Sequence, residues 1–153
     1  MKNTLRLKIP PVILALLALI GQLLTVDFHF VSFSPNVWQW LCALILLIAA
    51  IVLSSWSIML MKTARNSLNP HCPENTGRLI TAGIFAYTRN PMYLSLVLGL
   101  LATTILLGSF WGLVWVVVFI GLITELQIKP EEQILQKHFS EYAAYRRRVR
   151  RWF

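Results

Sequence analysis

The sequence predicts an all-α polytopic membrane protein with four transmembrane helices, and three observations carry this prediction. The chain of 153 residues is 57% hydrophobic and only 13% charged, whereas a typical soluble domain has about 25% charged residues. The mean hydropathy is +0.65, and the apolar residues come in long runs. A soluble domain of this length could not bury so much apolar surface. The composition therefore excludes a disordered tail, a collagen-like fibre and a disulfide scaffold, and the length predicts one domain over residues 1–153.

Four apolar runs give the predicted spans, since a helix needs roughly 20 mostly apolar residues to cross a bilayer. The first run opens with Pro10 and Pro11, which the first turn of a helix tolerates. The second run holds no charged residue. The third and fourth are separated only by a Gly108-Ser109 turn, which predicts an antiparallel hairpin. The predicted spans are 10–26, 38–61, 92–107 and 110–128.

The first run could also be a cleaved signal peptide, because Lys2, Arg6 and Lys8 precede its apolar core. The residues that follow the core are Thr-Val-Asp-Phe-His-Phe, in which there is no small-x-small cleavage site. A retained helix is therefore the favoured interpretation.

The basic residues predict the orientation of the spans. All 14 Lys and Arg lie before the first span, between the second and third, or after the fourth. The positive-inside rule then places both termini and the segments 62–91 and 129–153 in the cytoplasm, with the chain in the inner (plasma) membrane. The net charge of +8 is thus first of all an indication of topology.

The residues after the fourth span predict an amphipathic helix at the cytoplasmic interface. Apolar side chains recur there at roughly helical spacing among arginines, which suits a helix lying over anionic head groups. A solvated charged run and a nucleic-acid-binding segment are the alternatives. The apolar positions are Leu135, Phe139, Tyr142, Val149 and Trp152, and the arginines are Arg146, Arg147, Arg148, Arg150 and Arg151.

Two polar segments on this side could carry chemistry. The first, 63–93, is long for a loop in a compact domain, and such loops are usually functional or disordered. The second begins at Lys129 with Pro130-Glu131-Glu132. The predicted hairpin brings its two cytoplasmic ends together, so we expect the two segments to meet.

These two segments resemble a known family. Residues 79–93, Leu-Ile-Thr-Ala-Gly-Ile-Phe-Ala-Tyr-Thr-Arg-Asn-Pro-Met-Tyr, resemble the LVTxGxYxxxRHPxY motif of the isoprenylcysteine carboxyl methyltransferases and the related phospholipid N-methyltransferases. The family's second motif, EExxLxxxFGxxYxxYxxxV, resembles the residues from Glu131 to Val149. The resemblance covers about half of the chain, with both motifs in order and two apolar runs between them.

The resemblance implies an integral membrane methyltransferase that uses S-adenosyl-L-methionine. Its acceptor would be lipid-like or prenylated and would enter from the bilayer. Glu131, Asn90 and Arg89 would be catalytic, and Tyr142 is a further candidate. The residues expected at the cofactor are Thr81, Gly83, Tyr87, Arg89, Asn90, Pro91, Tyr93, Glu131 and Glu132.

Three positions depart from the family pattern. Asn90 replaces a histidine and cannot titrate near neutral pH, and Ser140 replaces a glycine. Gln127 stands where the prenylcysteine enzymes carry an arginine, which weakens the case for a carboxylate substrate. Neither the acceptor, nor whether oxygen, nitrogen or sulfur is methylated, follows from the sequence.

The residue types agree with this chemistry. A carboxylate such as Glu131 suits the ammonium or sulfonium of the cofactor, and Arg89 suits its carboxylate. The rings of Tyr87 and Tyr93 offer faces to a cation. Methyl transfer is an in-line displacement, so the protein mainly has to hold donor and acceptor in line.

Each feature also has a purely structural interpretation. Pro130-Glu131-Glu132 is an ordinary helix opening, and Asn90-Pro91 could cap the third span. The two tyrosines could be interfacial anchors. The rival function is a non-catalytic membrane protein of the same skeleton that scaffolds a partner or binds lipid.

The remaining polar residues carry weaker predictions. Glu125, near the end of the fourth span, is expected at the interface or facing a polar cavity, where it could lie near the acceptor. His71 beside Cys72 has no second cluster, so no metal site is expected, and His29 is expected in a solvated loop. Cys42 and Cys72 are expected to be free thiols. No span carries a compelling small-xxx-small face, so the oligomeric state stays open.

Overall fold

The computed structural model describes residues 9–26, 35–64 and 78–152, and within these ranges the chain is helical with no β-strand. His29, His71 and Cys72 lie outside the described residues. The helices are α1 (Pro11–Thr25), α2 (Val37–Thr63), η2 (Gly83–Ala86), α3 (Pro91–Leu107), α4 (Trp111–Ile123), η3 (Thr124–Ile128), α5 (Lys129–His138) and α6 (Tyr142–Arg148). The four predicted apolar runs therefore coincide with helices.

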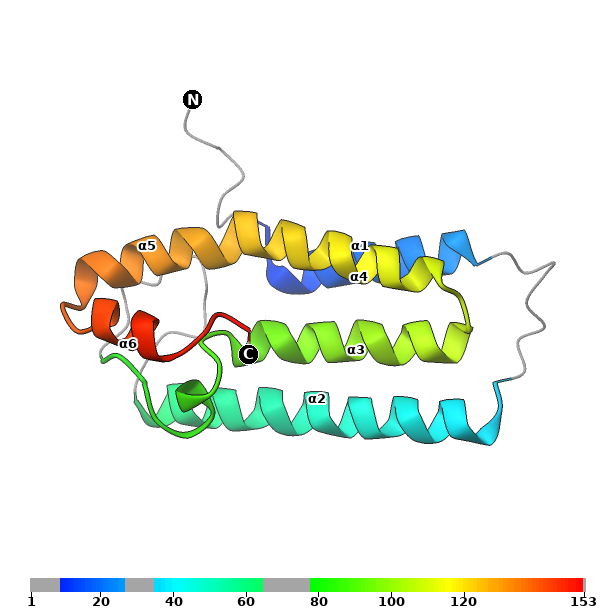
Figure 1. Cartoon of the computed structure of the whole chain (residues 1–153), viewed down its shortest axis with the longest axis horizontal. Coiled ribbons are helices and arrows are strands. Elements are labelled where there is room, and N and C mark those ends of the chain that lie inside the picture. The colour runs from blue at the N-terminus through cyan, green and yellow to red at the C-terminus, as the bar shows by residue number, and fades with distance from the viewer. Residues whose placement is uncertain (1–8, 27–34, 65–77, 153) are drawn as a thin grey trace, which may run out of the picture.

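The four apolar helices lie side by side and alternate in direction along the long axis of the molecule (Figure 1). Helix α3 packs between α2 and α4, and α1 covers α4 and α3. The turn between α3 and α4 lies at one end of this bundle, whereas α5, α6 and η2 gather at the other (Figure 1). The predicted α3–α4 hairpin is confirmed, and the two motifs lie at the same end.

Local sequence explains where the helices begin and end. Asn36 and Gln39 form a reciprocal capping box at the start of α2, with the Asn36 side chain accepting from the Gln39 amide at 3.0 Å. Pro91 occupies the first position of α3, where its missing N–H costs nothing. Gly108 ends α3 with φ of 61°, a left-handed conformation that glycine adopts without a steric penalty.

The helix that starts at Trp111 continues without a break to His138, but its pitch changes in the middle. Residues Thr124–Ile128 form a π-helical segment, η3. Pro130 follows directly, and a proline in a helix cannot donate to the residue four positions earlier, Leu126, and clashes with its carbonyl. The wider π turn accommodates this defect. The segment thus sits immediately before the acidic pair of α5.

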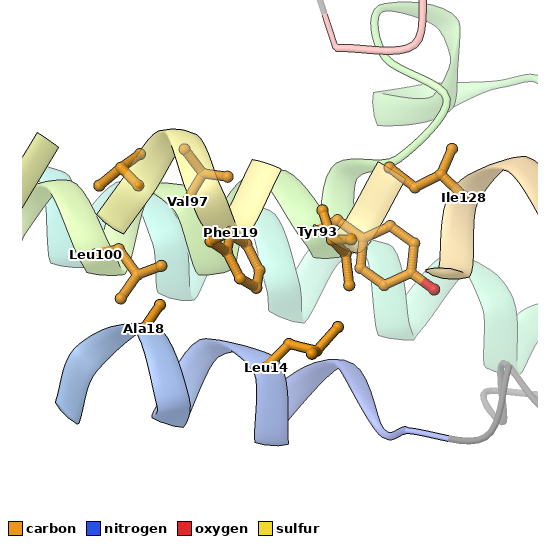
Figure 2. Close-up of a cluster of buried hydrophobic side chains, with 9 residues drawn as sticks. Leu14, Ala18, Tyr93, Val97, Leu100, Phe119 and Ile128 are labelled. Carbon is orange, nitrogen blue, oxygen red and sulfur yellow. The ribbon is translucent and has the colours of Figure 1, made fainter. Parts of the chain in front are cut away.

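One apolar core joins α1, α3 and the α4–η3 helix (Figure 2). Leu14 and Ala18 of α1 face Val97 and Leu100 of α3, with Phe119 of α4 fully buried among them. The core extends to the polar end of the bundle through Tyr93 and Ile128. The core therefore anchors both helix ends that carry the motifs.

Apolar side chains also cover the outside of the bundle. Only 11% of the apolar window of α2 is buried, and Ile45, Ile51 and Met59 are all more than half exposed. Exposed apolar surface of this extent marks contact with a membrane or a partner. Among the described residues, two helices, α2 and Trp111–His138, are long and apolar enough to cross a membrane, whereas α1 and α3 are apolar but have 15 and 17 residues.

The C-terminal segment differs from the single interfacial helix that the sequence predicts. The helix stops at His138, Phe139 is extended, and a second helix, α6, starts at Tyr142. Tyr142, Tyr145 and Val149 are buried together, with Leu79 of the first motif packed against them. This small second core places the residues that follow α6 against the start of α3.

Candidate active site at the polar end of the bundle

The chain approaches α3 through a tight turn that holds the first motif in place. Gly83 has φ of 61°, a left-handed conformation that favours glycine, and a Cβ atom at this position would lie 2.8 Å from the Cδ1 of Leu60 in α2. The helix η2 follows, and the Tyr145 hydroxyl donates a hydrogen bond to the Phe85 carbonyl at 2.7 Å. The first motif is thus fixed between α2 and α6.

A buried carboxylate, Glu132, lies between two arginines. Its Oε1 is 3.1 Å from Nη1 of Arg89, and both side chains are less than 10% exposed. The guanidinium of Arg151 binds the same carboxylate in a bidentate manner, with Nε 3.0 Å from Oε1 and Nη2 2.7 Å from Oε2. Buried carboxylates require such compensation, because removing an ion from water is costly.

The two tyrosines of α6 complete this cluster. Arg89 Nη1 donates to the Tyr142 hydroxyl at 3.3 Å, and the rings of Tyr142 and Tyr145 meet edge to face with centroids 6.0 Å apart. Burial, reinforced by the Glu132 carboxylate, raises the pKa of Tyr142, and burial also raises the pKa of Tyr145. The hydrogen bond to Glu132 raises the pKa of Arg151. At neutral pH the tyrosines are therefore neutral and Arg151 is charged.

Residues 149–152, the last that the structure describes, form a C-terminal strap across the start of α3. The Arg150 carbonyl accepts from the Arg89 amide at 3.1 Å. The Arg151 carbonyl accepts from the Asn90 side-chain amide at 2.9 Å and from the Thr88 hydroxyl at 3.2 Å. Trp152 packs against the apolar core. The strap is thus bound to the first motif by its backbone and to α5 by its arginine.

Glu131, next to Glu132, has different surroundings. The hydroxyl of Tyr93 donates to its Oε1 at 2.7 Å, and Figure 2 shows this hydroxyl at the edge of the apolar core. Within the described ranges, no lysine or arginine pairs with Glu131. Two adjacent carboxylates of the same helix turn therefore differ, one being doubly paired and the other having no cationic partner.

The charges of this region are separated. Arg89 and Arg151 share one carboxylate, which leaves a surplus positive charge, and the buried Arg89 Nε has no hydrogen-bond partner in the part of the chain that the structure describes. Glu131 has no lysine or arginine partner among the described residues, and burial raises the pKa of its carboxyl to about 7, so it is ionised in only part of the molecules at neutral pH. A ligand with an anionic and a cationic group would satisfy both sides, because buried polar groups are normally paired.

Comparison with known proteins decides the family. The profile of the phospholipid methyltransferases matches residues 38–142, which is more than half of the chain and includes the first motif and the start of the second, up to Tyr142. The chain belongs to the phospholipid methyltransferase family. A protein of uncharacterised function from Haemophilus influenzae is 47% identical over 62 residues, which are 40% of this chain and 98% of that protein. No solved structure matches.

Membership in the phospholipid methyltransferase family confirms the resemblance that the two motifs carry. The family consists of membrane methyltransferases with lipid-like substrates, and its members generally use S-adenosylmethionine. Together with the exposed apolar helices, the family indicates a membrane protein.

The structure brings most of the predicted site residues to one end of the bundle. Arg89 forms an ion pair with Glu132, and Asn90 donates a hydrogen bond to the strap. Tyr93 donates a hydrogen bond to Glu131. Tyr87 is 75% exposed, and Thr81 is half-buried in the turn before η2. Glu125 is exposed and pairs with Lys129. No group of three or more potential metal-binding side chains occurs among the residues described.

Two sequence-based interpretations need correction. Asn90 does not cap α3 with its side chain, because its side-chain amide donates a hydrogen bond to the Arg151 carbonyl of the strap. Arg151 does not lie over lipid head groups with the other C-terminal arginines, because it binds Glu132. The sequence offered no means of separating Arg151 from its neighbours, apart from the apolar Val149 and Trp152 that mark the tail as packed.

Proposed function

We propose that this protein is an S-adenosylmethionine-dependent methyltransferase of the inner membrane that methylates a lipid-like or prenylated acceptor. The observation that carries the proposal is the Glu131 carboxylate, which has no lysine or arginine partner among the described residues, in the same helix turn as the Glu132 carboxylate that Arg89 and Arg151 share. The methyl donor carries an ammonium, a sulfonium and a carboxylate. Its charged groups therefore complement those that this end of the bundle leaves unpaired.

We assign roles to the residues on this basis. Glu131 holds the cationic end of the donor, and the Tyr93 hydroxyl orients the carboxylate. The buried Nε of Arg89 is a donor available to the carboxylate of the ligand. Thr81, Gly83 and Pro91 shape the surrounding backbone. Asn90 acts on the site by fixing the strap, so its role is structural in this proposal rather than catalytic.

The reaction is a displacement. When bound, S-adenosylmethionine supplies a methyl group on a sulfonium sulfur. The acceptor atom forms a bond to the methyl carbon while the carbon–sulfur bond breaks, and the electron pair of that bond stays on sulfur as a neutral thioether. A carboxylate acceptor needs no base, whereas an amine acceptor loses a proton, for which Glu131 is the candidate base. The chain's main contribution is to hold the two reactants in line.

The proposed membrane arrangement has four spans, α1, α2, α3 and the α4–η3 helix, with both termini in the cytoplasm. The alternation of the four helices and the gathering of α5 and α6 at one end support it (Figure 1). All 14 basic residues then lie on one side of the membrane. The cofactor would approach from the cytoplasm, and the acceptor would approach laterally from the bilayer.

Titration of the purified protein in detergent tests this proposal. We expect saturable binding of S-adenosylmethionine and S-adenosylhomocysteine, and Glu131→Gln should weaken donor binding about tenfold or more, since it removes a charge-assisted contact. Glu141→Gln, which neutralises an exposed carboxylate near the same end, is the matched control and should change affinity less than about twofold. Transfer of labelled methyl groups to extracted membrane lipid would then identify the acceptor class.

Two results would overturn the proposal. The first is the absence of saturable binding of either compound to the wild-type protein, which would favour the non-catalytic scaffold. The second is an equal effect of Glu131→Gln and Glu141→Gln. A larger loss for S-adenosylmethionine than for S-adenosylhomocysteine would place Glu131 at the sulfonium, because only the methyl donor carries that charge, and equal losses would place it at the ammonium.

A further inference from the structure

The C-terminal strap connects the two motifs by two kinds of contact. Its backbone carbonyls at Arg150 and Arg151 accept hydrogen bonds from Thr88, Arg89 and Asn90, just before α3. Its Arg151 side chain holds Glu132 in the first turn of α5. The strap therefore fixes the distance between the start of α3 and the start of α5.

The first turn of α5 needs such support. It follows the π-helical segment η3, and Pro130 within it lacks the N–H that would otherwise continue the regular ladder. The helical backbone alone consequently determines the direction of α5 poorly at this point. The contacts of Glu132 compensate by fixing the turn from the side.

Arg151 contributes the larger part of this fixation. It makes two contacts with Glu132, at 3.0 and 2.7 Å, whereas Arg89 makes one, at 3.1 Å. A bidentate guanidinium–carboxylate pair fixes orientation as well as distance, which a lysine cannot do. Because Glu131 precedes Glu132 in the same turn, any rotation of this turn moves the Glu131 carboxylate relative to Tyr93.

We propose that Arg151 is a positioning residue of the active site, which acts through Glu132 to hold Glu131 against Tyr93 in the place where the methyl donor binds. The proposal rests on the proposed function. In this proposal Arg151 acts through Glu132 rather than by contact with the reactants, and the carboxylate of the ligand is bound by Arg89.

A double-mutant cycle on ligand affinity tests the proposal. S-adenosylhomocysteine is titrated into the full-length wild type, Arg151→Ala, Glu132→Gln and the double variant in detergent. We expect Arg151→Ala to weaken binding about tenfold, because a small displacement of a binding group is costly. In the Glu132→Gln background, Arg151→Ala should have little further effect, since the ion pair between Arg151 and Glu132 is already lost.

Two more variants separate positioning from folding and charge. Lys137→Ala removes one exposed positive charge from α5 and should change affinity less than about twofold. Arg151→Lys keeps the charge but loses the bidentate geometry, so it should be intermediate, and it supplies the test if Arg151→Ala fails to fold. Thermal unfolding confirms that each variant is folded before titration.

The proposal fails if folded Arg151→Ala, or Arg151→Lys in its place, binds as tightly as Lys137→Ala. It also fails if the effects of Arg151→Ala and Glu132→Gln simply add. These failures differ from failure of the proposed function, because they occur with a wild-type protein that binds S-adenosylhomocysteine, whereas a wild type that does not bind it rejects the methyltransferase proposal itself.

Discussion

The difference between Glu131 and Glu132 arises at the scale of single residues. Both are neighbours in one helix turn, and nothing in their local sequence distinguishes them. Their partners are distant in sequence. Glu132 binds Arg89, just before α3, and Arg151 in the strap, whereas Glu131 binds Tyr93 of α3. Only the tertiary structure therefore shows that one carboxylate is compensated and the other is available.

Asn90 is the residue whose predicted role changes most. Its position in the motif predicted a catalytic or cofactor-binding side chain, and a histidine stands there in the family pattern. Its amide instead donates to the Arg151 carbonyl at 2.9 Å, and the residue is buried. The neutral Asn90 amide can donate this hydrogen bond at any ordinary pH. Because it does not titrate, it cannot act as an acid or a base.

Asn90→Asp tests this role with an almost isosteric change. An ionised carboxylate can only accept, so it would face the Arg151 carbonyl without a proton between them. We expect the free energy of unfolding to fall by about 1–3 kcal/mol. Thermal or denaturant unfolding in detergent measures this change. Lower pH should reduce the loss, since a protonated carboxyl can donate again.

The matched control is Gln136→Glu, the same amide-to-acid change on the exposed face of α5. It should alter stability by less than about 0.5 kcal/mol. Equal destabilisation by the two substitutions, or a loss in Asn90→Asp that does not shrink with decreasing pH, would contradict the strap contact.

At the scale of helices, sequence patterns predicted existence and approximate bounds well. The run 92–107 became α3, Pro91–Leu107, because proline at the start and glycine at the end are local determinants. The break between α5 and α6 was not predicted, since the apolar spacing from Leu135 to Val149 is compatible with one helix. The break forms because Tyr142 and Tyr145 bury themselves against Leu79, a contact distant in sequence.

A buried glutamine joins α1 to the α3–α4 hairpin. Gln22 is fully buried, and its Nε2 lies 2.9–3.2 Å from the Leu100 carbonyl, the Thr104 hydroxyl and the Gly112 carbonyl. The Thr103 hydroxyl donates to its Oε1 at 2.6 Å. Side-chain hydrogen bonds of this kind join helices in membranes, where apolar packing alone gives little orientation.

Gln22→Leu removes these contacts at nearly constant volume. We expect it to lower the free energy of unfolding in detergent by about 1–2 kcal/mol, because polar atoms of α3 and α4 lose their partner on α1. Gln133→Leu, the same change at an exposed position of α5, should shift stability by less than about 0.5 kcal/mol. Equal shifts in both variants would show that the Gln22 cluster does not hold α1.

At the scale of the whole molecule, the charge pattern and the arrangement of the helices support the same topology. The α3–α4 turn, with Ser109, and the α5–α6 break, with Ser140, lie at opposite ends of the bundle (Figure 1). A bundle that places all basic residues on one side of the membrane follows the positive-inside rule without exception. The two serines should therefore lie on opposite sides of the bilayer.

Cysteine labelling in spheroplasts checks this topology. In a chain whose Cys42 and Cys72 are replaced by serine, we expect a membrane-impermeant maleimide to label Ser109→Cys in intact spheroplasts and Ser140→Cys only after permeabilisation. The reason is that reversal would move every lysine and arginine across the membrane, against the cost of translocating charged segments. Labelling of both positions from the same side would contradict a span between them, and the reverse pattern would place the proposed site outside the cytoplasm, away from its methyl donor.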